Sequence, residues 1–140
     1  AECIVDEELG IFTEAHFHEA LRREFSRARR YREFFTVLKG NVRGFEALAL
    51  DRRKVAWKAA AQVLSRALRV SDLVCRHPSP GVLWMLCPQS GSDAVAIRQR
   101  IESALGAYAG GLDLELAAVV GPEGFETPEA MLARLQEGAA

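Results

Sequence analysis

The chain has 140 residues, of which 49% are hydrophobic and 26% are charged, and its formal net charge is -1. This composition is typical of one soluble globular domain, because a chain of this length buries roughly 68% of the surface that its unfolded form exposes. A near-neutral charge gives no general attraction to nucleic acid, and no apolar run is long enough to cross a bilayer, so we expect a cytoplasmic protein without nucleic-acid binding or membrane insertion.

The first half of the chain begins with a helix and a strand. Apolar residues at three- and four-residue steps from Phe17 to Ala28 predict an amphipathic helix, with Thr13 as its N-cap. The apolar run over residues 34–39 then predicts a buried strand. We expect this strand to end at Gly40, because glycine weakens strand structure.

A second helix and a hairpin follow. The stretch 69–88 predicts the end of that helix, a short strand, a tight turn and a second apolar strand, and the turn carries no carboxylate. Trp57 and Trp84 are expected in the core or in an interface. The second helix is predicted over residues 51–68, with inward side chains at Val55, Ala59, Val63, Leu64 and Leu68.

The last part of the chain predicts two more helices and one strand. Ser92 or Asp93 can cap a third helix that ends near residues 110–111, and the stretch 112–120 predicts a strand that enters a sheet interior. Thr127 opens a final helix. The order helix, strand, helix, strand, strand, helix, strand, helix predicts an α/β sandwich, in which helices cover the faces of one mixed sheet.

The cysteines and histidines form no metal-binding motif. Cys3, Cys75 and Cys87 are odd in number and include no CxxC pair, which favours reduced thiols over a zinc site or a disulfide framework. His16 and His18 are two residues apart on a predicted helix, so they point to different sides and do not suit a shared metal. We therefore expect neither a metal nor a cofactor.

Several segments resemble, in chain order, the GGDEF domain of the diguanylate cyclase family, which joins two GTP into cyclic di-GMP. Residues 6–17 resemble the family's D-x-L-T-G-L-x-N-R-x-x-F, residues 27–31 resemble R-A-R-R-Y, and residues 41–46 stand where D-x-D-x-F-K is expected. Residues 69–76 resemble R-x-x-D-x-x-x-R, and the signature hairpin follows. The resemblance implies an α/β (α+β), nucleotidyl-cyclase-like fold with a ferredoxin-like central mixed sheet, in a single domain over residues 1–140 taken from a longer signalling protein.

The catalytic half of the family pattern is missing. Asn41 stands where the family has a metal-binding Asp, and the five signature letters fall on residues 78–82 or 79–83, which contain no acid in either alignment. Phosphoryl transfer needs hard cations held by carboxylates. Pro78 and Pro80 also stand where glycines would offer N–H groups to a triphosphate. The resemblance therefore implies a degenerate domain without diguanylate cyclase activity.

The product-binding motif of the family is retained. In active members R-x-x-D, five residues ahead of the signature, binds cyclic di-GMP, and Arg69 and Asp72 fit this spacing. A carboxylate accepts from N1 and N2 of guanine, and a guanidinium pairs with O6, N7 or phosphate. An arginine on the following helix often completes the family's site, and Arg100 stands at its position, with Arg98 as the fallback. Arg69 and Asp72 can instead only cap the helix and pair with each other.

The sequence leaves three functions open. The leading hypothesis is an inactive bacterial signalling domain that binds cyclic di-GMP through Arg69, Asp72 and Arg100 and relays it through association with a protein partner or a second copy. The alternative is a protein-interaction or dimerisation module that binds no nucleotide. A working cyclase would need Asp51 and Glu46 to serve from positions that the family does not use.

Overall fold

The computed structural model describes residues 4–88, 94–108 and 110–136, and it contains a six-stranded mixed sheet between two pairs of helices. The strand order is β1-β2-β4-β5-β3-β6, in which β2 and β4 are parallel and the other neighbours antiparallel. The predicted α/β sandwich is confirmed, although the sequence pattern does not predict β1 and β2. The elements are β1 (Val5–Asp6), β2 (Ile11–Phe12), α1 (Glu14–Tyr31), β3 (Phe35–Val42), the 3-10 turn η1 (Phe45–Ala47), α2 (Leu50–Ala67), β4 (Leu73–Arg76), β5 (Val82–Cys87), α3 (Val95–Ala107), β6 (Leu114–Gly121) and α4 (Pro128–Gln136).

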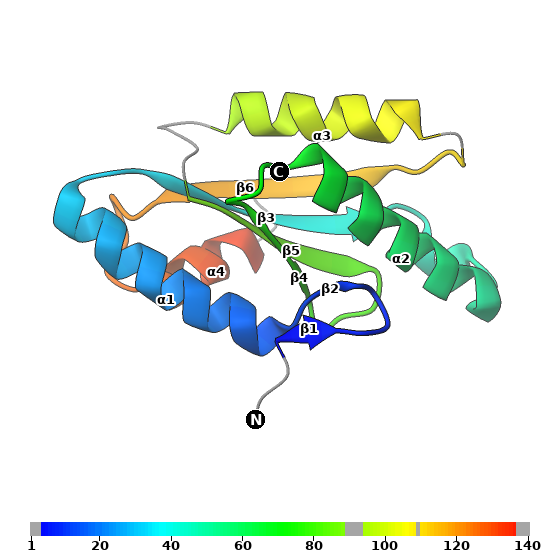
Figure 1. Cartoon of the computed structure of the whole chain (residues 1–140), viewed down its shortest axis with the longest axis horizontal. Coiled ribbons are helices and arrows are strands. Elements are labelled where there is room, and N and C mark those ends of the chain that lie inside the picture. Colours follow the sequence, from blue (N-terminus) through cyan, green and yellow to red (C-terminus); the bar gives the residue numbers. More distant parts are fainter. Residues whose placement is uncertain (1–3, 89–93, 109, 137–140) are drawn as a thin grey trace.

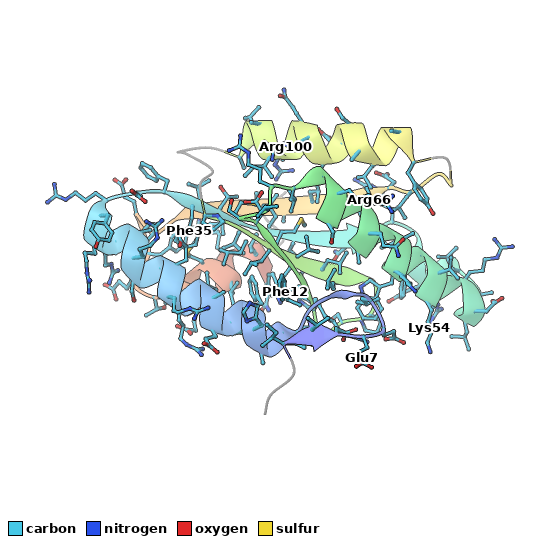
Figure 2. The ribbon with its side chains drawn as sticks, viewed as in Figure 1. Glu7, Phe12, Phe35, Lys54, Arg66 and Arg100 are labelled. Carbon is cyan, nitrogen blue, oxygen red and sulfur yellow. The ribbon has the colours of Figure 1, made fainter. Side chains whose placement is uncertain are left out.

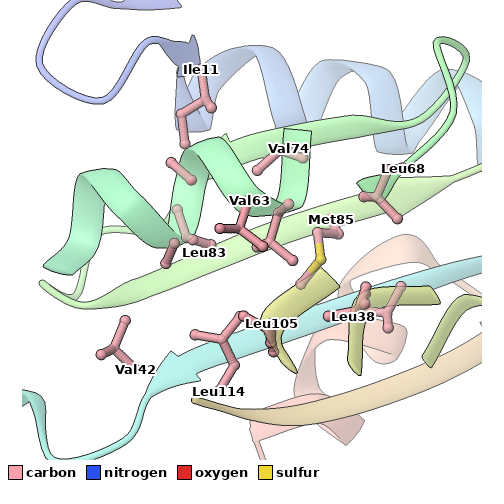
Figure 3. Close-up of a cluster of buried hydrophobic side chains, with 14 of the residues drawn as sticks. Ile11, Leu38, Val42, Val63, Leu68, Val74, Leu83, Met85, Leu105 and Leu114 are labelled. Carbon is pink, nitrogen blue, oxygen red and sulfur yellow. The ribbon is translucent and has the colours of Figure 1, made fainter. Parts of the chain in front are cut away.

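Helices cover both faces of the sheet: α1 and α4 lie on one face, and α2 and α3 lie on the other (Figure 1). Side chains alternate along β3, so that Val37 packs with α1 and α4 whereas Leu38 packs with α2 and α3. Figure 3 shows the cluster between the sheet and the helices α2 and α3, to which Met85 of β5 and Val63 of α2 both belong. Within the described part of the chain, no helix is long and apolar enough to cross a membrane.

Side-chain caps set two of the helix starts that the sequence predicts. Thr13 is the N-cap of α1, and its Oγ1 accepts a hydrogen bond from the His16 N–H at 3.3 Å. Thr127 Oγ1 accepts from the Ala130 N–H at 3.2 Å at the start of α4. Both predicted openings are confirmed. The caps predicted for the third helix, at residues 92–93, lie outside the described residues.

Two sequence predictions are wrong: that β3 ends at Gly40, and that Val55 of α2 points inward. Gly40 does not end β3, which continues to Val42 because β5 and β6 pair with it on both sides. A Cβ at Gly40 would lie 3.3 Å from Met85 Cε, so the glycine leaves room for that side chain. In α2, Val55 is 66% exposed and not inward. Trp57 points inward instead, because side chains two positions apart on a helix point to nearly opposite sides.

Both tryptophans are buried, in agreement with the prediction, and so are both described cysteines. Trp57 is 5% exposed and Trp84 is 2% exposed. The Trp84 ring stacks on Phe17, with ring centroids 4.9 Å apart and planes 5° from parallel. Cys75 and Cys87 behave as small core residues, with 0% and 1% exposure. Of the two predicted positions, core or interface, Trp84 therefore occupies the core.

Arg76, at the end of β4, joins the N-terminal segment to the hairpin. Its Nη1 lies 2.8 Å from Asp6 Oδ2 and 2.8 Å from Glu8 Oε1. Its guanidinium lies 4.4 Å from the centre of the Trp57 ring, and the Trp57 N–H donates to Val82 O at 3.0 Å. We call Asp6, Glu8, Trp57 and Arg76 the Arg76 cluster. It connects the β1–β2 turn, α2 and the start of β5.

We expect the Arg76 cluster to lose its stabilising effect in acid. Hydrogen bonding to Arg76 lowers the pKa of Glu8; partial burial opposes ionisation of Asp6, but hydrogen bonds from the Leu9 N–H and Arg76 outweigh it and lower that pKa too. A lowered folded-state pKa stabilises the fold above the usual values of 3.8 and 4.5, and this stabilisation is lost as the pH falls through the folded pKa.

Asp6→Asn should therefore lower the free energy of unfolding by about 1–2 kcal/mol at neutral pH. The difference from the natural chain should shrink as the pH falls below about 4. Denaturant unfolding, followed by circular dichroism over a pH series, measures both quantities. The exposed Glu123→Gln variant is the control and should match the natural chain throughout. A difference for Asp6→Asn that stays constant down the series would contradict the expectation.

Gly81, in the hairpin turn, should not tolerate a side chain. Its φ is +82°, and an added Cβ would lie 2.6 Å from Cγ of Phe45. The Val82 N–H donates to Ser79 O at 3.2 Å and closes the turn around this residue. Gly81→Ala should lower the free energy of unfolding by about 1–3 kcal/mol. The control is Gly10→Ala, where φ is +71° but no atom lies within 4 Å of the added Cβ; equal losses in both variants would exclude the contact with Phe45 as a cause.

Candidate functional site

The connection between α2 and β4 is a tight turn that brings Arg69 and Asp72 together. The Arg69 N–H donates to Asp72 Oδ2 at 2.8 Å, and the Asp72 N–H donates to Arg69 O at 2.9 Å. These two hydrogen bonds between Arg69 and Asp72 close the turn and fix the position of the Asp72 carboxylate. The sequence left open whether this pair only caps the helix end. In the structure, Asp72 accepts a hydrogen bond from the Arg69 backbone N–H, just after the end of α2.

The side chains of this turn keep hydrogen-bonding capacity for a ligand. Arg69 is exposed, and in the described ranges its guanidinium has no ion-pair partner. One Asp72 oxygen accepts the Arg69 N–H, but each carboxylate oxygen has two lone pairs, so Asp72 still has acceptor sites. The turn therefore offers one cation with five N–H donors and one carboxylate.

Cys87, at the end of β5, has a thiol on which the charges of both Asp72 and Arg100 act. Burial raises the pKa of the Cys87 thiol, the Asp72 carboxylate raises it further through its charge and a hydrogen bond, and Arg100 acts in the opposite direction. Both charged side chains thus lie near the same buried sulfur. Arg100 is half-buried on α3 (Figure 2). Arg69 and Asp72 thus share one turn, and the charge of Arg100 acts on the same thiol as the charge of Asp72.

Arg98 makes a different contact. Its Nη1 donates to Leu116 O of β6 at 3.3 Å. Arg98 and Arg100 are two residues apart on α3, so their side chains leave the helix in different directions. Arg100, and not the fallback Arg98, is therefore the α3 arginine that accompanies Asp72.

A cleft of about 230 Å³ opens beside the Arg69–Asp72 turn. Its walls come from the strands β1 and β2, the last turn of α2 and the start of β4, and we call it the edge cleft. The sequence gives no signal for this cleft, because two-residue strands show no periodic pattern. Its lining includes Val5, Ile11, Ser65, Leu68, Arg69 and Asp72.

A larger pocket, of about 550 Å³, lies between the hairpin turn and the end of β3. Asn41 Oδ1 is buried there and accepts no hydrogen bond from the residues that the structure describes. Glu46, exposed on η1, is the one carboxylate among the described lining residues. Nowhere in the described ranges do three His, Cys, Asp or Glu side chains gather in a way that could hold a metal ion. We call this site the hairpin pocket, and its lining includes Lys39, Asn41, Phe45, Glu46, His77 and Pro80.

His77 and Lys39 are residues of the hairpin pocket that the sequence analysis did not single out. Burial lowers the pKa of His77 to about 4, and the charges of Lys39 and His18 add to the shift. The imidazole is therefore neutral at pH 7. Its Nδ1 accepts from the Ser79 N–H at 2.9 Å, so the ring proton is on Nε2. One sequence feature could have indicated Lys39: it is the one charged residue in the predicted strand 34–39.

Known proteins resemble this chain in fold more clearly than in sequence. No protein-family model matches it, and no curated protein does. A structure of the GGDEF domain of PA1120 (TpbB or YfiN) from Pseudomonas aeruginosa is 25% identical, with a TM-score of 0.79 over 92% of this chain and 82% of that one. Diguanylate cyclase SiaD from Pseudomonas aeruginosa, in complex with its activator SiaC, is 20% identical, with a TM-score of 0.82 over 97% of this chain and 56% of that one.

A third structure is the GGDEF domain of DgcB from Caulobacter crescentus, in complex with c-di-GMP. It is 11% identical, with a TM-score of 0.82 over 98% of this chain and 88% of that one. The three likenesses span almost the whole chain, from the N-terminal strands to α4, and they agree with the segments that resemble the family in the sequence. The chain is a GGDEF-like domain.

Proposed function

We propose that this chain is a catalytically inactive GGDEF-like signalling domain that binds cyclic di-GMP through Arg69, Asp72 and Arg100 and relays the signal through protein association. The observation that carries the proposal is that Asp72, fixed by its bond to the Arg69 backbone, and Arg100 both act by their charge on the thiol of Cys87. Arg69 and Asp72 belong to the turn between α2 and β4, which their two hydrogen bonds close, and Arg100 belongs to α3.

The chemistry of these three side chains fits a guanine nucleotide with phosphates. Asp72 offers acceptors for the N1 and N2 donors of guanine, and the two guanidinium groups offer donors to O6, N7 or phosphate oxygens. Two cations and one carboxylate leave a local positive charge, which favours a ligand with two phosphates. The DgcB domain, which has a similar fold, was solved in complex with c-di-GMP, and this supports the ligand class.

Catalytic inactivity is the second part of the proposal. Magnesium prefers carboxylate oxygens, and the hairpin pocket offers Glu46 as the one carboxylate among its described lining residues. Asn41 offers a neutral amide, and Gly81 at the hairpin turn offers no side chain. These residues do not fit a pair of divalent cations, so we derive no metal-dependent step for this chain.

The second candidate function is a nucleotide-independent module for protein interaction or dimerisation. Leu50 and Val55, on the first turns of α2, are 77% and 66% exposed, and exposed apolar side chains favour a partner surface. SiaD, which has a similar fold, was solved in complex with its activator SiaC. This candidate differs from the first one in that it requires no nucleotide.

Isothermal titration calorimetry with cyclic di-GMP should detect saturable binding to the natural chain. Arg69→Ala should weaken the binding about tenfold or more, because the lost hydrogen bonds to a charged group are worth about 1.5–3 kcal/mol. The matched control is Arg66→Ala, which removes an exposed arginine from the last turn of the same helix. Its affinity should equal that of the natural chain.

Failure of the natural chain to bind at high micromolar ligand would exclude the receptor and favour the interaction module. Equal weakening by Arg66→Ala and Arg69→Ala would instead indicate a nonspecific effect of charge. Light scattering with and without cyclic di-GMP tests the relay, for which we expect a ligand-dependent change in mass for the chain alone or with its partner.

Incubation of the natural chain with GTP and magnesium should give no cyclic di-GMP. The physical reason is the lack of carboxylates that could hold two cations next to the hairpin turn. Chromatographic separation of the nucleotides measures the product, and an active diguanylate cyclase in a parallel reaction is the control. Steady formation of cyclic di-GMP that depends on the chain would overturn the proposed inactivity.

A further inference from the structure

The edge cleft continues from the Arg69–Asp72 turn toward the N-terminal strands, and the contacts proposed above do not use it. Arg69 and Asp72 line it at one end, and Ser65 of α2 and Ile11 of β2 line it farther on. Its volume of about 230 Å³ is below the roughly 300–1,000 Å³ of pockets that take a whole drug-sized ligand. The cleft therefore suits one ring system and not an entire dinucleotide.

The walls of the edge cleft are apolar away from the turn. Ile11, Leu68 and Val74 belong to the core cluster between the sheet and α2. Val5 is 44% exposed and adds an apolar rim, and the hydroxyl of Ser65 is the one polar side-chain group apart from the turn among the described lining residues. Such walls can contact the faces of an aromatic ring, but they offer few groups that would read the pattern of donors and acceptors at its edge.

The edge cleft and Arg100 lie on opposite sides of Asp72. The strand order β2-β4-β5 places β2, which lines the cleft, on one side of β4. It places β5, whose Cys87 lies near Arg100, on the other side. A ligand held at Asp72 can therefore extend toward Arg100 in one direction and into the cleft in the other.

Cyclic di-GMP carries two guanine bases, but the site offers one carboxylate. Asp72 can pair with the N1 and N2 donors of one guanine only. The second base therefore needs a surface of another kind, and the cleft that shares Arg69 and Asp72 as lining residues supplies one.

We propose that the edge cleft receives the second base of cyclic di-GMP through apolar contact with its faces. This inference rests on the function proposed above and adds a second half to its site. The strands β1 and β2 then form one wall of the ligand site. The two halves differ in selectivity: Asp72 requires guanine, whereas the cleft accepts either purine. Adenine has no N1–H and no N2 amino group, so it cannot replace the guanine at Asp72.

Calorimetry with three cyclic dinucleotides on the natural chain tests the selectivity. The mixed ligand, with one guanine and one adenine, should bind within about threefold of cyclic di-GMP, because stacking on apolar walls tolerates either base. Cyclic di-AMP should bind about tenfold to a hundredfold more weakly than cyclic di-GMP, because it lacks the bidentate pair with Asp72. A mixed ligand as weak as cyclic di-AMP would overturn the inference, since it would mean that both bases are read as guanine.

A variant that fills the cleft gives an independent test. Ser65 is exposed on α2 and lines the cleft, so Ser65→Trp should block it without disturbing the core. We expect cyclic di-GMP to bind this variant about tenfold more weakly, the value of one base contact. The control is Gln62→Trp, which adds the same side chain to an exposed position of α2 outside the cleft lining and should leave binding unchanged. Circular dichroism confirms that both variants fold.

The outcomes separate the two proposals. If the natural chain binds cyclic di-GMP and Ser65→Trp binds it equally well, the cleft is not part of the site, and the proposed function stands without it. If the natural chain does not bind cyclic di-GMP at all, both proposals fail. Should Ser65→Trp not fold, the comparison of the three dinucleotides on the natural chain still decides.

Discussion

One cation, Arg76, connects the parts of the chain that build both pockets. It bonds Asp6 and Glu8 near the N-terminus and stacks on Trp57 of α2, which in turn bonds Val82 at the start of β5. The strands β1 and β2 have two residues each, so their backbone hydrogen bonds alone hold them weakly. The Arg76 and Asp6 side chains are 31% and 16% exposed, and such a partly shielded, hydrogen-bonded pair is stronger than a surface pair. The position of the N-terminal segment therefore depends on Arg76.

The hairpin pocket and the edge cleft differ in their chemistry. In the hairpin pocket, Glu46 is the one carboxylate among the described lining residues, and Lys39 brings a positive charge. At the edge cleft, Asp72 and Arg69 contribute one carboxylate and one guanidinium to the lining. Cation-dependent bond making needs several carboxylates at one point, whereas recognition of a base needs a few donors and acceptors in fixed positions. Both pockets thus support recognition as the function we propose.

The helices and long strands follow from patterns that act over a few residues, such as the cap at Thr13 and the apolar runs of the sheet. These patterns fail where contacts with residues distant in the sequence determine the end of a strand or the burial of a side chain. Gly40 continues β3 because two neighbouring strands pair with it, and its own preference is too weak to end the strand. Trp57, and not Val55, faces inward because its ring packs under Arg76 and bonds β5. The strands β1 and β2 are too short to give a pattern.

The residues of the candidate site also fall into two groups: those whose contact can be predicted from local sequence, and those that only the tertiary fold brings close. Arg69 and Asp72 are three residues apart at a helix end, so their contact can be predicted from the sequence alone. Arg100 lies near them because α3 packs over the same face of the sheet, beside Cys87, and only its alignment with the family pattern indicated this. The wall of the edge cleft comes from Ile11 and its neighbours, which the N-terminal ion pairs place. The proposed recognition of the first base thus depends on local sequence, and the proposed recognition of the second depends on the tertiary fold. A change in the N-terminal segment can therefore alter the second without altering the first.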